Sequence, residues 1–161
     1  MVEKSSLLSC ICVVKVSGVE RFTATEELFK QEANVKRMND DFRENFVDKT
    51  EDKVEDATLA THRLEEHSQN ALIRAQLGDC ALIKLCHFFD FLKQQAKDQN
   101  GPLLINIWSG CLVYMLDKNE KPWTVLARWF YDWQCNLDAY PIENRFKQRI
   151  GSHVVSYNFD K

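Results

Sequence analysis

Lys84, His87 and Asp90 are the residues whose types and spacing best suit acid–base chemistry. They follow one another at three-residue intervals, which places them on one edge of a helix, where side chains three apart are neighbours. In that arrangement a carboxylate can orient an imidazole while a lysine adds positive charge, so the group can exchange protons with a substrate. The alternative is structural: the three form a polar seam on a buried helix and satisfy one another.

Six cysteines are the other reactive groups: Cys10, Cys12, Cys80, Cys86, Cys111 and Cys135. On a helix Cys86 points about 100° away from His87, which disfavours a Cys–His catalytic pair there. The spacings typical of zinc sites are absent. Because a chain of this length does not need disulfides to fold, we expect reduced thiols packed as small apolar side chains and a cytoplasmic location.

No motif for a cofactor or a catalytic metal is present. His62 and His67 are five residues apart, off the spacing of about one turn that two ligands on one helix face need. The chain has neither a Gly-rich phosphate-binding loop nor a Gly-x-Ser-x-Gly nucleophile turn. The sequence therefore predicts no metal, no cofactor and no enzyme activity.

All four tryptophans lie between Trp108 and Trp133, and this part of the chain supplies the predicted binding surface. Trp and Tyr bring large contact areas at small entropic cost and dominate the hot spots of protein interfaces. Most aromatic residues of the helix expected there belong to its core face, but Trp123 lies at its start, and Tyr131 lies about 100° round it from Phe130. The predicted partner-binding residues are Trp108, Tyr114, Trp123, Arg128 and Tyr131.

Strands and helices must position these groups. Strands are expected near 8–16, 103–108, 111–117 and 153–159, because these runs are rich in β-branched and aromatic residues. Helices are expected near 24–47, 51–67, 69–98 and 122–149, from apolar residues at helical spacing. Between Ala81 and Leu92 only Lys84, His87 and Asp90 are polar, so we expect the helix there to be covered on nearly all sides.

The order of these elements is strand, helices, strand, strand, helix, strand. It predicts an α+β fold: a four-stranded antiparallel sheet in split β-α-β order, with an enlarged helical layer on one face. The length of 161 residues is close to a common domain size, so a single domain spanning residues 1–161 is expected.

Charge and hydropathy argue against two classes of partner. The net charge of −3, from 21 basic and 24 acidic side chains, lacks the positive field of a typical nucleic-acid binder. Acidic residues concentrate between Ala24 and Asn70, so a partner that meets this part of the chain would be basic. No apolar run reaches the roughly 18–20 residues of a membrane span, so no membrane partner is expected.

On these grounds we expect a non-catalytic intracellular protein–protein interaction module, an adaptor or regulatory protein. Its expected partner is another protein that is basic or presents a strand or helix, and we also expect that the chain can form a homodimer through the first helix or an exposed sheet edge. Two alternatives remain. One is an RNA-binding module of split β-α-β type, and the other is an enzyme that uses His87 and Asp90 or a reactive cysteine.

Overall fold

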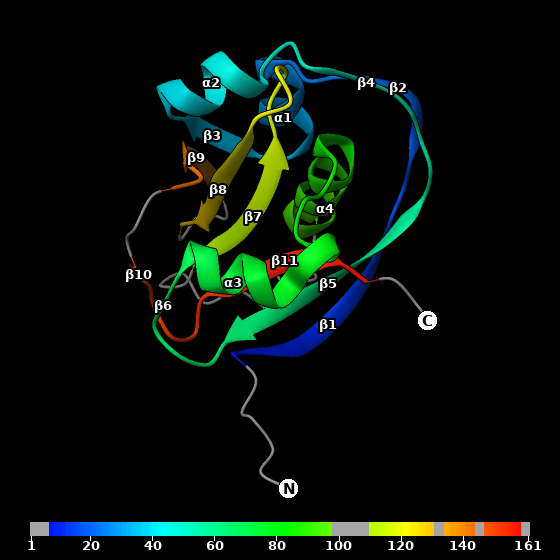
Figure 1. Ribbon diagram of the computed structural model, residues 1–161. Helices are drawn as coiled ribbons and strands as arrows, with labels where there is room; N and C mark the ends of the chain where they lie inside the picture. Colours follow the sequence, from blue (N-terminus) through cyan, green and yellow to red (C-terminus); the bar gives the residue numbers. More distant parts are fainter. Residues whose placement is uncertain (1–6, 98–109, 131–133, 144–146, 159–161) are drawn as a thin grey trace, which may run out of the picture.

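The computed structural model of the protein describes residues 7–97, 110–130, 134–143 and 147–158. Over these ranges the chain forms a seven-stranded mixed sheet, two small two-stranded sheets and four α-helices (Figure 1). The strands are β1 (Leu8–Val16), β2 (Val19–Thr23), β3 (Val35–Met38), β4 (Thr50–Val54), β5 (Ala57–Leu64), β6 (Ser68–Gln69), β7 (Cys111–Leu116), β8 (Pro122–Trp129), β9 (Cys135–Pro141), β10 (Lys147–Gln148) and β11 (His153–Tyr157). The helices are α1 (Glu26–Glu32), α2 (Asp40–Phe46), α3 (Asn70–Leu77) and α4 (Leu85–Lys97), with a 3-10 turn, η1, over Gly78–Cys80.

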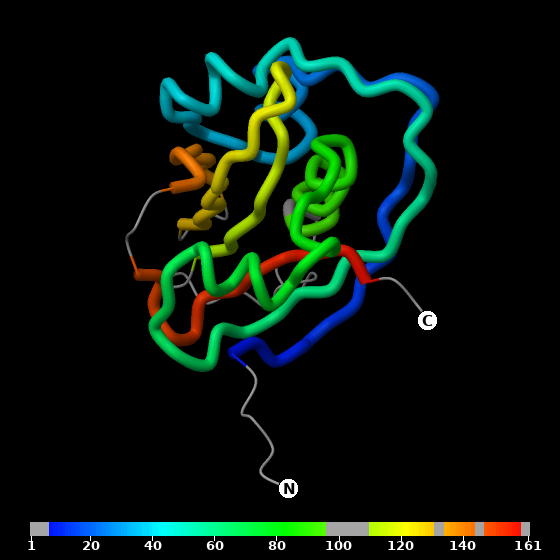
Figure 2. Tube along the Cα trace, in the orientation of Figure 1, coloured from blue at the N-terminus to red at the C-terminus, as the bar shows by residue number. Residues whose placement is uncertain are grey.

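The large sheet has the order β1-β5-β11-β7-β8-β9-β3, with parallel pairing only between β11 and β7 and between β3 and β9. β1 pairs with β5, and their continuations β2 and β4 pair with each other, so these four strands form one long ribbon. Figure 2 shows the ribbon rising from the β1 side of the sheet and arching to α1 and α2 near β3. The ribbon therefore connects the two ends of the sheet.

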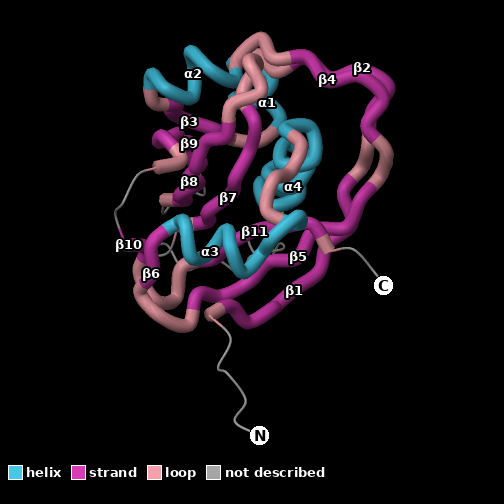
Figure 3. The backbone as a smooth tube through the Cα atoms, viewed as in Figure 1, coloured by secondary structure: helices cyan, strands magenta, loops and turns pink. Residues whose placement is uncertain are grey.

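α4 lies inside this arch, between the strands of the large sheet, the ribbon and α1 (Figure 3). Leu85, Phe88, Phe91 and Leu92 of this helix are fully buried, and the core around it includes Leu59, Val113, Val125 and Val155 from the sheet. The ring centroid of Phe89 lies 5.3 Å from that of Phe22 in β2 and 5.0 Å from that of Phe29 in α1. The predicted central helix, covered on nearly all sides, is thus confirmed, although it begins at Leu85.

The opposite face of the sheet is covered by α3. A second, smaller cluster there joins Ile73 of α3 to residues of β1, β5, β7 and β11: Leu8, Leu64, Leu112, Tyr114 and Val154. The sheet is therefore packed on both faces near its middle, which explains why β7 is buried along nearly its whole length.

The predicted fold class is wrong, because the sheet has seven strands and mixed pairing in place of four antiparallel strands. Three predicted strands do form: 8–16 is β1, 111–117 contains β7, and 153–159 contains β11. The expected strand over 103–108 lies outside the described residues. The split β-α-β order fails because two of the four segments expected to be helical, 51–67 and 122–149, form strands in their described residues.

The predicted helix over 122–149 is wrong, since its described residues form β8, β9 and β10. The cause lies just before it, in the turn that joins β7 to β8. The Asp117 side chain accepts from the N–H groups of Asn119 (2.7 Å) and Lys121 (2.9 Å), and Glu120 adopts a left-handed conformation with φ of 61°. This geometry reverses the chain into a hairpin, so Pro122 begins an antiparallel strand and not a helix.

The other three expected helices are also corrected. The segment 24–47 is broken by Asn34 (φ 55°), which ends α1, and β3 then precedes α2. The segment 51–67 forms no helix and contributes most of β4 and all of β5, which pair with distant strands. The segment 69–98 is divided at Gly78 (φ 58°), which ends α3 and separates it from α4.

Candidate functional site

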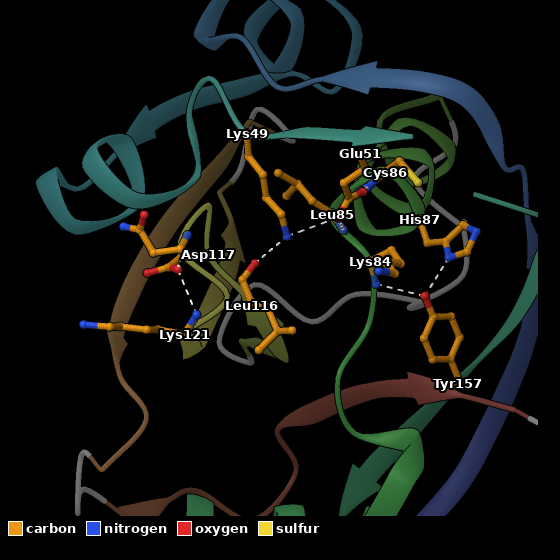
Figure 4. Close-up of polar contacts among 11 residues, drawn as sticks. Lys49, Glu51, Lys84, Leu85, Cys86, His87, Leu116, Asp117, Lys121 and Tyr157 are labelled. Carbon is orange, nitrogen blue, oxygen red and sulfur yellow. Dashed lines mark hydrogen bonds and ion pairs between the residues drawn. The ribbon is translucent and has the colours of Figure 1, made fainter. Parts of the chain in front are cut away.

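The predicted acid–base residues lie around the start of α4, where Figure 4 shows part of their network. The Lys84 backbone N–H donates to the Tyr157 hydroxyl (2.9 Å), and this hydroxyl lies 2.7 Å from His87 Nδ1. His87 Nε2 lies 2.7 Å from the backbone oxygen of Glu55. Because a carbonyl oxygen only accepts, Nε2 carries a proton, and in the neutral ring Nδ1 accepts from Tyr157.

These contacts use both nitrogens of His87 to join α4 to β11 and to the link between β4 and β5. His87 is 3% exposed, and burial raises the pKa of Tyr157 to about 12, so the phenol stays protonated at neutral pH. Asp90 makes other contacts: its Oδ2 accepts from the backbone N–H of Ser17 (3.0 Å) and from the side chain of Gln94 (3.1 Å). His87, Tyr157 and the backbone groups of Lys84 and Glu55 thus form a structural hydrogen-bond network, and Asp90 is not part of it.

Lys49 and Glu51 form a largely buried ion pair near this hydrogen-bond network (Figure 4). Glu51 accepts from the first two amides of α4, those of Leu85 (3.0 Å) and Cys86 (2.9 Å). Lys49 Nζ lies 3.2 Å from Glu51 Oε2 and donates to the backbone oxygen of Leu116 (2.6 Å). Burial alone would raise the pKa of Glu51, but the Cys86 amide, the Lys49 charge and the Leu85 amide outweigh it, and the pKa is lowered.

All six cysteines are free thiols. Burial raises the pKa of Cys86 to about 12, and the Glu51 carboxylate adds to the shift. Burial also raises the pKa of Cys111 and Cys135. A thiol whose pKa is raised holds little thiolate at neutral pH, so these three residues are packing residues and not activated nucleophiles.

No arrangement for holding a metal appears in the part of the chain that the structure describes, in the sense of three or more His, Cys, Asp or Glu side chains gathered together. In the same part, none of the helices has the length and apolarity to cross a membrane.

The three predicted partner-binding residues that the structure describes, Tyr114, Trp123 and Arg128, do not form one surface. Tyr114 is fully buried, and its hydroxyl donates to Asn70 Oδ1 (3.0 Å), so it offers no contact area to a partner. Trp123 is half-buried against the main core, and its indole N–H donates to Asp117 Oδ2 (2.8 Å). Arg128 is exposed and pairs with Asp138 (3.1 Å). Trp108 and Tyr131 lie outside the described residues.

Strand alternation explains this separation. Tyr114 and Thr124 are register partners, as are Met115 and Trp123, and successive side chains of a strand point to opposite faces. Arg128 follows Trp123 by an odd number of positions along β8, so the two side chains lie on opposite faces of the sheet. On the predicted helix both would have faced solvent.

The two outer strands of the large sheet differ in how they are protected. β3 has four residues, a bulge between Val35 and Arg37, and the exposed cations Lys36 and Arg37, which are common defences of a sheet edge. β1 also has a bulge, between Cys10 and Cys12, but it has nine residues with one charge, Lys15, and its apolar side chains Ile11 and Val13 are 41% and 50% exposed. We call residues 9–13 the β1 edge.

Gln94 covers one end of the outer side of β1, where its side-chain amide donates to the Lys15 backbone oxygen (2.8 Å). Among the strands that the structure describes, only β5 pairs with β1. The β1 edge is therefore the long, apolar and weakly charged border of the sheet.

Sequence reasoning did not single out Ile11, Val13, Lys49, Glu51 or Tyr157. The run Leu8–Val16 predicts a strand, but its own residues do not give the order of the strands in the sheet, so its place at the edge is not predicted. Glu51 and Tyr157 contact Leu85 and His87 of α4 from 34 and 70 residues away, and no local spacing indicates such contacts.

Comparisons with protein-family models, with curated proteins and with solved structures find no match to this chain, so its function must be argued from its own geometry.

Proposed function

We propose that the protein is a non-catalytic protein–protein interaction module that binds an extended segment of another protein along the β1 edge. The observation that carries the proposal is the exposure of Ile11 and Val13 on a nine-residue outer strand. Exposed apolar side chains on an outer strand favour the addition of a further strand.

Binding of this kind uses the backbone as well as the side chains. Antiparallel or parallel addition of a strand pairs its N–H and C=O groups with those on the outer side of β1, and alternate side chains then pack on Ile11 or Val13. Because backbone pairing does not depend on sequence, these apolar contacts supply the selectivity. A second copy of the chain that presents its own β1 is one such partner.

The chemistry near α4 supports a binding role over catalysis. The His87 nitrogens, the Asp90 carboxylate and the buried thiols all serve contacts inside the protein. The argument for an RNA-binding module rested on a four-stranded sheet, which this protein lacks. Six free thiols favour a reducing compartment, so we place the module inside the cell, as an adaptor or regulatory protein.

A peptide selection tests the proposal. A displayed library of extended peptides is selected on the wild-type protein, and the affinity of the enriched peptides is measured by fluorescence anisotropy. Ile11→Lys and Val13→Lys each add a charge at the β1 edge and should weaken binding tenfold or more, about 1.4 kcal/mol. Bound peptide should slow amide exchange over residues 9–13.

Ile150→Lys is the matched control, because Ile150 is also an exposed apolar residue (56%) and lies in the turn before β11, outside residues 9–13. It should leave the affinity unchanged. Sedimentation velocity on the same variants shows whether a second copy occupies the edge. The proposal is wrong if the selection yields no peptide whose binding depends on Ile11 or Val13.

A further inference from the structure

A groove of about 440 Å³ lies between α3, the segment that follows it, and the ends of β8 and β9. Its lining is mostly small or apolar: Ala71, Ala75, Gly78, Leu82, Pro122 and Ile142. Leu82 is 41% exposed. Ala71, Ala75 and Gly78 recur at four and three residues and so line one side of α3, where they leave room for another backbone to approach.

Arg74 is the only charged residue of this lining. It is half-buried, its Nε atom is buried without a hydrogen-bond partner, and no carboxylate in the described part of the chain lies within ion-pair distance of it. The nearby phenol of Tyr114 does not supply the missing charge. Burial raises its pKa, although the Arg74 charge opposes the shift, and its hydroxyl already donates to Asn70.

A cation that is partly withdrawn from water without a counterion costs free energy, and a carboxylate that enters the groove would recover it. From this buried Nε atom without a partner, in a groove whose lining is otherwise small or apolar, we propose that the groove binds an amphipathic helix of a partner protein. That helix presents apolar side chains to Leu82 and Ile142 and an Asp or Glu to Arg74.

A helix fits this site better than a strand. The backbone of α3 satisfies its own hydrogen bonds and ends at Gly78, whose N–H donates to the Arg74 carbonyl, so the groove offers no open row of backbone groups. An incoming helix needs none, since its own backbone is also satisfied, and it packs through side chains alone. The β1 edge is not part of this site, so the inference does not depend on the proposed function.

Parallel selections from a displayed library of amphipathic helices test the inference. One selection uses the wild-type protein and the other uses Arg74→Met, which keeps the side-chain length and removes the charge. We expect the wild-type selection to enrich Asp or Glu at one position, and the Arg74→Met selection to show no such preference. Replacing that acidic residue by Gln in a selected peptide should weaken wild-type binding at least tenfold and leave binding to Arg74→Met unchanged.

Two further variants separate binding from folding. Ala71→Trp fills the groove from an exposed helix position and should abolish binding, whereas Ile11→Lys, at the β1 edge, should not affect it. Arg74→Met should unfold at the same or a higher temperature than the wild type, because the buried Nε atom has no hydrogen bond to lose. Peptides without an acidic preference, an undiminished preference in Arg74→Met, or a strongly destabilised Arg74→Met would each overturn the inference.

Discussion

Single residues at the start of α4 decide how this helix is held in the core. Glu51 accepts two helix amides, and Lys49 neutralises Glu51 while it donates to the end of β7. A buried ion pair of this kind contributes little over an apolar pair of the same shape, but removal of one partner leaves the other charge unpaired. The pair is therefore costly to break.

Glu51→Gln should lower the free energy of unfolding by about 3 kcal/mol, because Lys49 loses its counterion and the helix loses its anionic cap. Urea denaturation followed by tryptophan fluorescence measures the change. Arg63→Met is the control: it breaks the exposed ion pair between Arg63 and Glu65 (3.1 Å) and should cost about 0.5 kcal/mol or less. Equal effects of the two substitutions would contradict a buried role for Lys49 and Glu51.

At the scale of elements, the turn between β7 and β8 has the strongest local determinant. Asp117 is 1% exposed and accepts three hydrogen bonds, two from the backbone and one from the Trp123 indole. Burial alone would raise the pKa of Asp117, but the Lys121 amide, the Trp123 indole and the Asn119 amide outweigh it, and the pKa is lowered. One carboxylate thus sets both the turn and the position of the tryptophan.

Asp117→Ala should lower the free energy of unfolding by about 3 kcal/mol, since three donors lose their acceptor. Asp117→Asn keeps one acceptor oxygen and should cost less, and Lys118→Ala, in the same turn, should be close to neutral. Hydrogen exchange should report faster exchange of the β7 and β8 amides in Asp117→Ala. Unchanged exchange there would show that strand pairing, and not the carboxylate, sets the hairpin.

What the sequence predicted correctly was local. β1, β7 and β11 are dense runs of β-branched and aromatic residues, and α4 carries an apolar stretch too wide for a surface helix. β9 shows the opposite case. Its residues Cys135, Leu137 and Ala139 alternate inward, but Leu126 and Trp129 of the preceding strand β8 lie at helical spacing with Leu137 and Tyr140, so the sequence pattern predicts one helix over both strands.

Some of the errors have a second physical cause: strands are stabilised by partners that are distant in sequence. β4 and β5 are polar on one side and owe their form to β2, β1 and β11, so their own residues carry a weak signal. The sequence placed Trp123 and Arg128 at exposed positions of one helix, whereas the sheet puts them on opposite faces. The edge position of Ile11 and Val13 depends on the order of seven strands and was not predictable locally.

At the scale of the whole molecule, the ribbon of β1, β5, β2 and β4 closes the fold around α4. The two sides of the ribbon approach closely at Gly18, where a Cβ atom would overlap the carbonyl oxygen of Val54, so only glycine fits. The Gly18 N–H donates to Asp56 Oδ1 (2.7 Å) at the same point. Because the ribbon, α4 and both ends of the sheet meet in one core, their stability should respond together to a change of conditions such as pH.

Buried titratable groups indicate how acid should act on this core. Burial lowers the pKa of His62 and of His153 from the ordinary value of 6.5, and the charge of Arg63 adds to the shift for His153. A histidine with a depressed folded-state pKa contributes stability above about pH 6.5, which is lost as pH falls toward the folded pKa. The pKa of Glu51 is also lowered, from 4.5, so its contribution persists to lower pH and is lost below that value.

We therefore expect the free energy of unfolding to fall in two stages as the solution is acidified, one below about pH 6.5 and one below about pH 4.5. His62→Asn should reduce the first stage, to which His153 also contributes, and leave the second. Glu51→Gln should reduce the second stage, to which Asp117 also contributes, and leave the first, so each variant controls for the other. Urea titrations across this range measure both stages. A wild-type protein whose stability is constant from neutral pH to about pH 5 would show that His62 and His153 are not held neutral in the folded state, and that the sheet around β5 and β11 admits water.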